Sequence, residues 1–200
     1  MIRRAPGRPT ARRTRPILLA AIAGTALLGI LGFPSVAGWS SSPASSASSA
    51  SSADGVVPDG VTVYDDEYPA VARLDPAILA ALRRAATDAA SDGVMLYVNS
   101  GWRSAAYQEK LLDDAVAEYG SREKAARWVA TATTSTHVSG EAVDIGHAEA
   151  TAWLSEQGAA YGLCQIYANE PWHYELRPDA VASGCPAPYA DPTQDPRMQP

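Results

Sequence analysis

The sequence is short of cysteine and, after its first residues, of basic side chains. Its two cysteines lie 21 residues apart and form no CxxC pattern, which argues against a metal site built on thiolates. Six of the 16 basic residues precede Ile17, so the other ten stand against all 22 acidic residues. A chain this acidic is a poor partner for nucleic acid or for an anionic lipid surface.

Long hydrophobic runs are also scarce. The one long uncharged apolar run, Ile17–Phe33, directly follows the arginine-rich start, which is typical of an export signal or a membrane anchor. Its length leaves both alternatives open, and a signal would be cleaved after Ala37, where small residues occur. Both alternatives place the rest of the chain outside the cytoplasm, where Cys164 and Cys185 are expected to form a disulfide.

Composition divides the chain into four parts. Residues 1–37 are the predicted signal peptide or N-terminal membrane anchor, and residues 38–55 are a Ser- and Ala-rich linker that is too polar to bury a core. Residues 56–190 are long enough for one domain with its own hydrophobic core. Residues 191–200 are a Pro-rich C-terminal tail.

Helices and strands alternate in the predicted domain. Asp75 followed by Pro76 is a typical helix start, and Gly93 lies beyond the expected end. Patterning predicts further helices over 104–118, 121–130 and 148–157, strands over 94–98, 142–145, 163–167 and 172–176, and a loop at 131–141. This order predicts an α+β fold in which helices flank a small antiparallel sheet.

Three residues in the second half of the chain have the chemistry of a metal site. Asp144 lies in the apolar strand AVDI, where a carboxylate is costly to bury without a cation. His137 lies in a loop of Ser, Thr and Gly, and His173 lies on the last predicted strand. Alone, His137 is compatible with a solvated turn and His173 with a hydrogen-bonded core residue. Together, two imidazoles and one carboxylate can hold zinc and leave a fourth position for water, as in catalytic sites.

Two ordered motifs carry a family resemblance. STHVSGEAVDIG at 135–146 and EPWHYE at 170–175 follow SGWRS at 100–104. About residues 56–190 resemble the VanY-type D-alanyl-D-alanine carboxypeptidases of the VanX/VanY zinc peptidase group, whose pattern is S-x-H-x-x-G-x-A-x-D followed by E-x-W-H. Its positions are filled by Ser135, His137, Gly140, Ala142, Asp144, Glu170, Trp172 and His173.

The resemblance implies both a fold and a site. The fold is that of the Hedgehog/DD-peptidase group, and the cofactor is one Zn²⁺ per chain. The implied site residues are His137, Asp144 and His173 as zinc ligands, Glu170 as general base, Arg103 as the group that stabilises charge at the scissile carbonyl, and Ser135 and Gln108 as substrate contacts.

Strand geometry and the resemblance disagree about the base. Glu175 shares a face with His173 on a strand of period two, whereas Glu170 does not. Pro171 takes Glu170 out of regular strand geometry, so we follow the resemblance. Glu175 is then either a hydrogen-bonding partner of a zinc histidine or a solvated carboxylate. His147 lies outside the pattern and is expected at the rim of the site.

The sequence thus predicts a monomeric zinc carboxypeptidase, secreted or anchored to the outer face of the cytoplasmic membrane, that removes the terminal D-alanine from peptidoglycan stem peptides. The same scaffold serves L,D-carboxypeptidases and D-Ala-D-Ala dipeptidases, which remain alternatives. So does a non-catalytic module that binds the cell wall and keeps zinc for structure. A serine D,D-peptidase is disfavoured, because no K-T-G follows the lone S-x-x-K that ends at Lys124.

Overall fold

The structure is a computed structural model that describes residues 50–199. The predicted export segment and most of the predicted linker lie outside this part of the chain. Within it, no helix is both long enough and apolar enough to cross a membrane. The short helix η1 (Ser52–Asp54) already belongs to the domain, because the Ser104 hydroxyl donates a hydrogen bond to Asp54. The domain therefore starts a few residues before the predicted boundary at residue 56.

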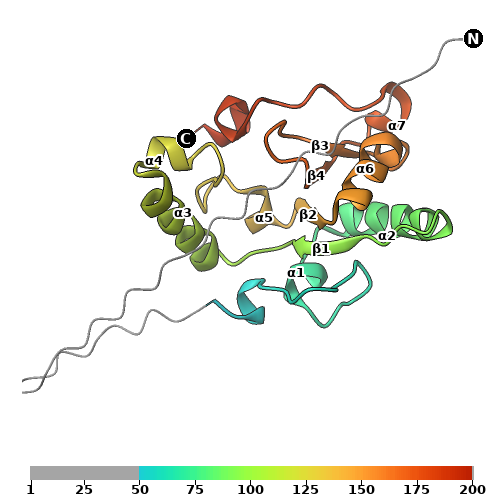
Figure 1. Cartoon of the computed structure of the whole chain (residues 1–200), viewed down its shortest axis with the longest axis horizontal. Coiled ribbons are helices and arrows are strands. Elements are labelled where there is room, and N and C mark those ends of the chain that lie inside the picture. Colours follow the sequence, from blue (N-terminus) through green and yellow to red (C-terminus); the bar gives the residue numbers. More distant parts are fainter. Residues whose placement is uncertain (1–49, 200) are drawn as a thin grey trace, which may run out of the picture. The chain divides into compact units, whose positions relative to one another are not determined.

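A four-stranded sheet lies at the centre of the domain (Figure 1). Its order is β1-β2-β4-β3, and each neighbouring pair is antiparallel. The strands are β1 (Tyr97–Ser100), β2 (Ala142–Gly146), β3 (Leu163–Gln165) and β4 (His173–Leu176). The predicted α+β class with a small antiparallel sheet is confirmed.

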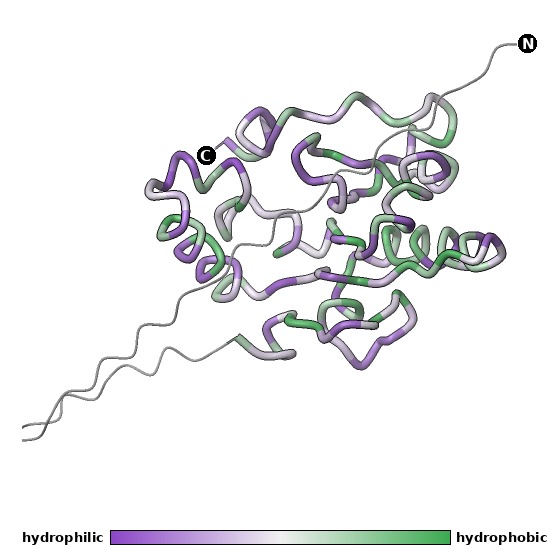
Figure 2. The backbone as a smooth tube through the Cα atoms, viewed as in Figure 1, coloured by the Kyte–Doolittle hydropathy of each residue, from purple (hydrophilic) through white to green (hydrophobic). Residues whose placement is uncertain are grey.

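Helices cover one face of this sheet. The helices α2 (Pro76–Ser91) and α6 (Ala148–Gln157) have the predicted limits, and the Asp75 side chain caps α2 as expected. Successive strand residues point to opposite faces, so alternate side chains reach the main hydrophobic cluster, among them Val143, Ile145 and Tyr174. Green segments in Figure 2 follow α2 and the adjoining strands. The opposite face of the sheet carries polar side chains.

The other long helix, α3 (Ala105–Tyr119), lies on the side of β1 away from α2 in Figure 1. The Ser104 side chain caps its start, and Gly120 ends it with a φ of 81°, a value that favours glycine. The remaining helices are short: α1 (Pro69–Ala72), α4 (Arg122–Ala125), α5 (Thr136–Ser139), α7 (Ala180–Ser183), η2 (Gly158–Tyr161), η3 (Pro192–Gln194) and η4 (Pro196–Met198).

The first strand lies further along the chain than its apolar run predicts. The Val94 N–H donates to the Ala89 carbonyl at the end of α2, so the start of the run is a turn. Ser100, which is polar and lies beyond the predicted strand over 94–98, pairs with Asp144 of β2 after an irregularity in the ladder. Tertiary pairing, rather than local hydrophobicity, decides where β1 ends.

Two predicted segments near the centre of the chain also differ. The helix expected over 121–130 ends at Ala125, and the following turn brings Arg127 to Asp191. The loop expected over 131–141 contains the helical turn α5, whose Thr- and Ser-rich sequence gives no helical signal. α5 closes at Gly140, where φ is 78° and an added Cβ would collide with the backbone.

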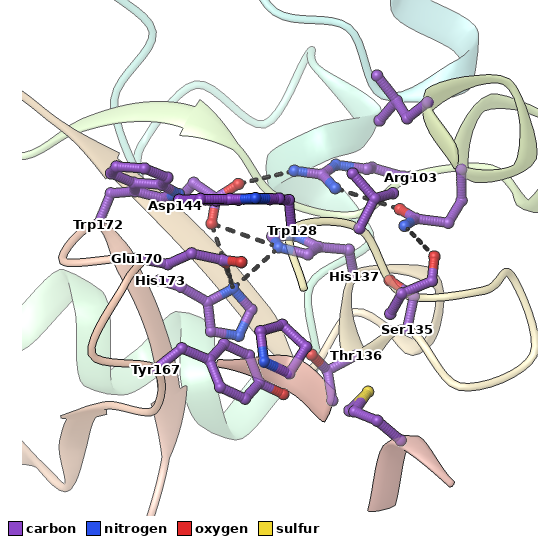
Figure 3. A pocket seen from close by; sticks show the side chains of 16 residues that line it. Arg103, Trp128, Ser135, Thr136, His137, Asp144, Tyr167, Glu170, Trp172 and His173 are labelled. Carbon is purple, nitrogen blue, oxygen red and sulfur yellow. Dashed lines mark hydrogen bonds and ion pairs between the residues drawn. The ribbon is translucent and has the colours of Figure 1, made fainter. Parts of the chain in front are cut away.

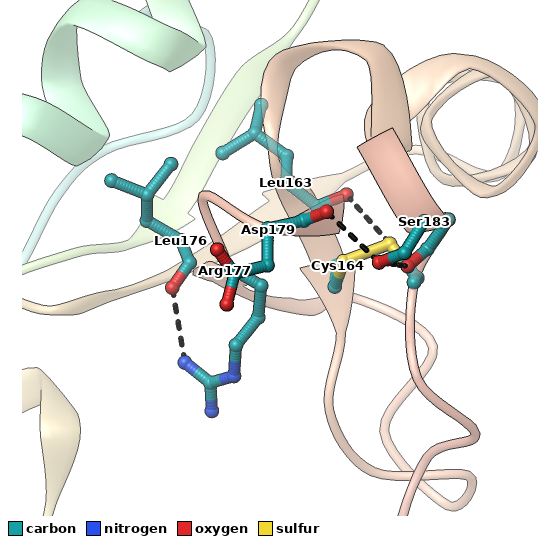
Figure 4. The surroundings of a disulfide bond; sticks show 8 residues. Leu163, Cys164, Leu176, Arg177, Asp179 and Ser183 are labelled. Carbon is teal, nitrogen blue, oxygen red and sulfur yellow. Dashed lines mark hydrogen bonds between the residues drawn. A yellow bond between two sulfur atoms is a disulfide. The ribbon is translucent and has the colours of Figure 1, made fainter. Parts of the chain in front are cut away.

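The C-terminal residues belong to the domain rather than to a separate tail. The predicted disulfide between Cys164 and Cys185 is present, with Cα atoms 5.5 Å apart (Figure 4). Beyond it the chain crosses back toward α4 (Figure 1). Residues 191–198 form two turns whose first side chains, Asp191 and Asp195, are buried and act as caps. These caps give the Pro-rich segment a defined place, so the predicted boundary at residue 190 is too early.

Candidate metal centre

Three polar side chains from different elements meet on the open face of the sheet (Figure 3). The His137 Nε2 lies 3.2 Å from the His173 Nδ1 and 3.4 Å from the Asp144 Oδ1, and the latter two atoms are 3.3 Å apart. All three side chains are buried. The structure therefore brings together the three residues that the sequence singles out as a metal site.

Sheet register explains the position of two of these residues. Asp144 of β2 and His173 of β4 are direct partners in the ladder, and such partners share a face of the sheet. His137 approaches from α5, and its Nδ1 lies 2.8 Å from the Gly101 carbonyl oxygen. A carbonyl can only accept, so Nδ1 carries the proton and Nε2 keeps a lone pair for the site.

His173 is held from its other side by Glu175. The His173 Nε2 lies 3.2 Å from the Glu175 Oε1, and an ionised carboxylate can only accept, so Nε2 carries a proton and Nδ1 is the nitrogen that faces the cluster. Partners of this kind orient metal-binding histidines. Glu175 is 1% exposed and is not a solvated carboxylate. Its other hydrogen-bond donors are Thr136, Arg177 and Arg197.

The surroundings favour a positive charge at the cluster. Burial opposes ionisation of Asp144, but the two histidines and Arg103 hold its pKa well below the usual range. Burial alone would lower the pKa of His173, yet hydrogen bonds to Asp144 and Glu175 raise that pKa to about 9. Burial lowers the pKa of His137. Asp144 and Glu175 are thus two ionised carboxylates within a buried site, which is suited to hold a cation.

Glu170 lies beside the cluster in the loop before β4. It is 7% exposed, and its Oε2 lies 3.9 Å from the His173 Nδ1. Its Oε1 is buried and has no hydrogen-bond partner within residues 50–199. Burial raises the pKa of the Glu170 carboxyl to about 7. A carboxyl with this pKa can exchange a proton at neutral pH.

Arg103 lies next to Asp144 with its guanidinium group held at three points. Nη2 donates to the Asp144 Oδ2 at 2.7 Å, Nε to the Ser100 hydroxyl at 2.7 Å, and Nη1 to the Gln108 Oε1 at 3.2 Å. Gln108 is 1% exposed, and its Nε2 donates to the Ala130 carbonyl. Gln108 thus supports the guanidinium group of Arg103 from within the fold, and it also lines the cavity over the cluster.

A cavity of about 210 Å³ opens over the cluster. Ser135 lies in its wall at the start of α5, and its hydroxyl does not cap that helix, which keeps it suitable for a ligand contact. Two exposed indoles, Trp128 and Trp172, also line the cavity (Figure 3). The Trp128 ring stacks on Tyr119 of α3. His147, by contrast, is exposed at the start of α6 and is not among the clustered ligands.

Two residues at this site have no sequence signal. Tyr167 places its ring 5.0 Å from that of His173, and its hydroxyl donates to Asp195. On a predicted strand, an aromatic residue is indistinguishable from an ordinary core residue. Arg197, which lies behind Glu175, falls in the segment predicted to be a tail. The sequence alone gives no indication that either residue contacts the site.

Three buried ligands at the base of a cavity, with a carboxylate and a fixed guanidinium beside them, are typical of the mononuclear metal sites of hydrolases. The family model of VanY, D-alanyl-D-alanine carboxypeptidase, matches residues 71–179 of the chain. The chain therefore belongs to the VanY family.

One relative and two solved structures show how far the similarity extends. The D-alanyl-D-alanine carboxypeptidase of Enterococcus faecalis (strain ATCC 700802 / V583) is 35% identical over 43% of this chain and 41% of its own length. The chain thus matches less than half of that protein. VanYB in complex with D-alanine-D-alanine is 29% identical, with a TM-score of 0.51, over 56% of this chain and 74% of that one.

A structure of LdcB, an LD-carboxypeptidase, is 24% identical to this chain with a TM-score of 0.51. The match covers 64% of this chain and 70% of that one. At this level of identity it supports the fold alone.

Proposed function

We propose that the protein is an extracytoplasmic zinc carboxypeptidase that removes the terminal D-alanine from peptidoglycan stem peptides. The observation that carries this proposal is the buried cluster of His137, Asp144 and His173, with Glu170 beside it. Membership of the VanY family supports the reaction. The VanYB complex with D-alanine-D-alanine supports a substrate that ends in this pair.

The three clustered side chains fit a zinc ion. Their atoms are 3.2 to 3.4 Å apart, close to the edge of about 3.3 Å in a tetrahedron with metal bonds of ~2.0–2.1 Å. Two imidazole nitrogens suit zinc better than calcium or magnesium, which prefer oxygen ligands. When bound, Zn²⁺ supplies a lowered pKa, ~7, for a coordinated water and polarises the scissile carbonyl.

Glu170 is the proposed general base. Glu170 lines the cavity, and its Oε1 has no partner in the described part of the chain, so the carboxyl can take a proton from the attacking water. A pKa of about 7 lets the same carboxyl release that proton to the amine of the departing D-alanine. Glu175 cannot serve in this way, because its oxygens are occupied by other donors.

Arg103 is the proposed charge-stabilising group. Each terminal guanidinium nitrogen has two N–H groups, and the contacts to Asp144 and Gln108 use one at each. The second set can meet negative charge at the scissile carbonyl or at the peptide's terminal carboxylate. We assign Ser135 to substrate contact and Gln108 to the support of Arg103.

The proposed location outside the cytoplasm rests on the N-terminal sequence. The basic start and the apolar run Ile17–Phe33 indicate export or anchoring. The disulfide between Cys164 and Cys185 supports an oxidising compartment. A stem-peptide substrate is found on the same side of the membrane. We expect the protein to act as a monomer.

Defined peptides with mass-spectrometric detection test the proposal. Full-length protein is incubated with a pentapeptide ending in D-Ala-D-Ala, a tetrapeptide ending in one D-Ala after an L-configured centre, and free D-Ala-D-Ala. We expect the pentapeptide to lose one D-alanine, with the activity removed by a chelator and restored by Zn²⁺. Cleavage of the tetrapeptide alone would identify an L,D-carboxypeptidase, and cleavage of the dipeptide alone a dipeptidase. Bound zinc without any cleavage would indicate a wall-binding module.

A further inference from the structure

Residues 191–198, the C-terminal clasp, contact the carboxylate that orients His173. The Arg197 Nη1 donates to the Glu175 Oε2 at 2.7 Å, and its Nη2 lies 3.4 Å from the Oε1. That second oxygen is the one that accepts the hydrogen bond from the His173 Nε2. Arg197 therefore contacts Glu175, and Glu175 in turn contacts the proposed zinc ligand His173.

We propose that Arg197 is a positioning residue of the metal centre. By holding both oxygens of Glu175 it sets the orientation of the His173 ring, and the C-terminal clasp thereby sets the affinity for zinc. The inference rests on the proposed function only through the metal. It does not depend on which peptide the protein cleaves.

The clasp is itself firmly held, which a positioning role requires. Asp195 is fully buried and pairs with Arg197 through both of its oxygens, a bidentate geometry that restricts the guanidinium plane. At the other end of the clasp, the Arg127 Nε lies 2.9 Å from the Asp191 Oδ2. Arg197 therefore approaches Glu175 from a fixed backbone rather than from a free end.

A second contact links the clasp to the same imidazole. The Tyr167 hydroxyl donates to the Asp195 Oδ2 at 3.1 Å, and the Tyr167 ring lies 5.0 Å from the His173 ring. The clasp thus restricts His173 along its Nε2 direction, through Glu175, and across its ring face, through Tyr167. Both restraints favour the orientation in which Nδ1 points to Asp144.

Arg177 provides an internal comparison. It also donates to Glu175, but only to the Oε2, at 2.8 Å, and the oxygen bonded to His173 is left to Thr136 and Arg197. Arg177 lies two residues after Glu175, at the end of β4. Loss of Arg177 should therefore disturb the histidine less than loss of Arg197.

The experiment measures zinc affinity of the full-length protein by competition with a chromophoric chelator. We expect Arg197→Ala to weaken zinc binding about 10- to 100-fold, the range typical for partners of metal-binding histidines, and Arg197→Lys to recover part of the loss. Arg177→Ala should have a smaller effect. Arg84→Ala, which removes an exposed positive charge from α2, is the matched control and should leave affinity unchanged.

A double-mutant cycle with Glu175→Gln tests whether Arg197 acts through Glu175. If it does, the double variant loses little more affinity than either single variant. Additive losses, or an Arg197→Ala affinity within twofold of wild type together with a lower melting temperature, would leave Arg197 a purely structural residue and overturn the inference. If Arg197→Ala does not fold, Arg197→Gln and Arg197→Lys supply the same comparison. A wild-type protein that binds no zinc would instead refute the proposed metal centre itself.

Discussion

The two carboxylates on either side of His173 are both buried, yet their surroundings are opposite. Glu170 is 7% exposed and Glu175 is 1% exposed. Glu175 accepts hydrogen bonds from four side chains, and these outweigh the effect of burial and lower its pKa. Glu170 has a buried oxygen without a partner in the described chain, and burial raises its pKa to about 7. The donors of Glu175 are Thr136, His173, Arg177 and Arg197.

The difference shows that the supply of donors, not burial, separates a structural carboxylate from a reactive one. Glu175 keeps its charge because both of its carboxylate oxygens accept hydrogen bonds. It can therefore orient a histidine but cannot exchange a proton readily. Glu170 is poorly stabilised as an anion and can take up a proton. Strand periodicity selects Glu175 as the base, whereas the surroundings of the two carboxylates support Glu170 in the proposed role.

The largest expected effect is that of Glu170→Gln on turnover. The amide keeps the size of the side chain but cannot accept and return a proton, so we expect kcat to fall by roughly 10²–10⁴-fold. Zinc content should be unchanged, because Glu170 is outside the ligand cluster. Hydrolysis of the D-Ala-D-Ala pentapeptide and metal analysis of the same sample measure the two quantities. Turnover near the wild-type level would remove Glu170 from the reaction.

The next largest effect concerns the free energy of unfolding, for which replacement of Glu175 should matter more than replacement of Glu170. Glu175→Ala leaves the buried His173 without the carboxylate that faces its Nε2, and breaking a buried pair of this kind costs about 3–5 kcal/mol. Glu170→Ala removes a carboxylate that lacks donors, so the free energy of unfolding should fall by no more than ~1 kcal/mol. Urea unfolding of the two metal-free variants makes the comparison. Equal losses would show that burial alone governs both residues.

Much of the fold could be predicted from local signals. Asp75 and Ser104 are helix caps whose side chains bond to the first turn, and α6 begins and ends where composition indicates. A candidate metal residue could also be predicted in this way, because Asp144 in an apolar strand is too costly to bury without a cation, and the structure places it in a cluster that could hold one. Each of these features depends on a few neighbouring residues.

The features that could not be predicted depend on contacts between distant segments. α5 presents His137 from a sequence without helical periodicity, and Gln108 is occupied by Arg103 and the Ala130 carbonyl, which patterning cannot show. Arg197 reaches Glu175 from a segment whose prolines resemble a disordered tail. In each case the tertiary fold supplies a partner that composition does not reveal.

Gln108→Leu extends the comparison to the positively charged side of the site. Leucine is similar in size but leaves the buried Ala130 carbonyl without its donor and Arg103 with one contact fewer. We expect a stability loss of about 1–3 kcal/mol and a fall in kcat with little change in KM, because Arg103 is less well placed. A raised KM with unchanged kcat would restore Gln108 to the role of substrate contact.

Thr136→Val should have the smallest effect and shows how many donors Glu175 needs. The change removes the hydroxyl that donates to the Glu175 Oε1 at 3.2 Å and keeps the volume of the side chain. Because Arg177 and Arg197 still hold the carboxylate, we expect a stability loss of only about 1 kcal/mol and zinc affinity within a few-fold of wild type. Chemical denaturation and chelator competition measure both. A loss of zinc affinity as large as that of Glu175→Gln would mean that the hydroxyl, rather than the two arginines, keeps Glu175 directed at His173.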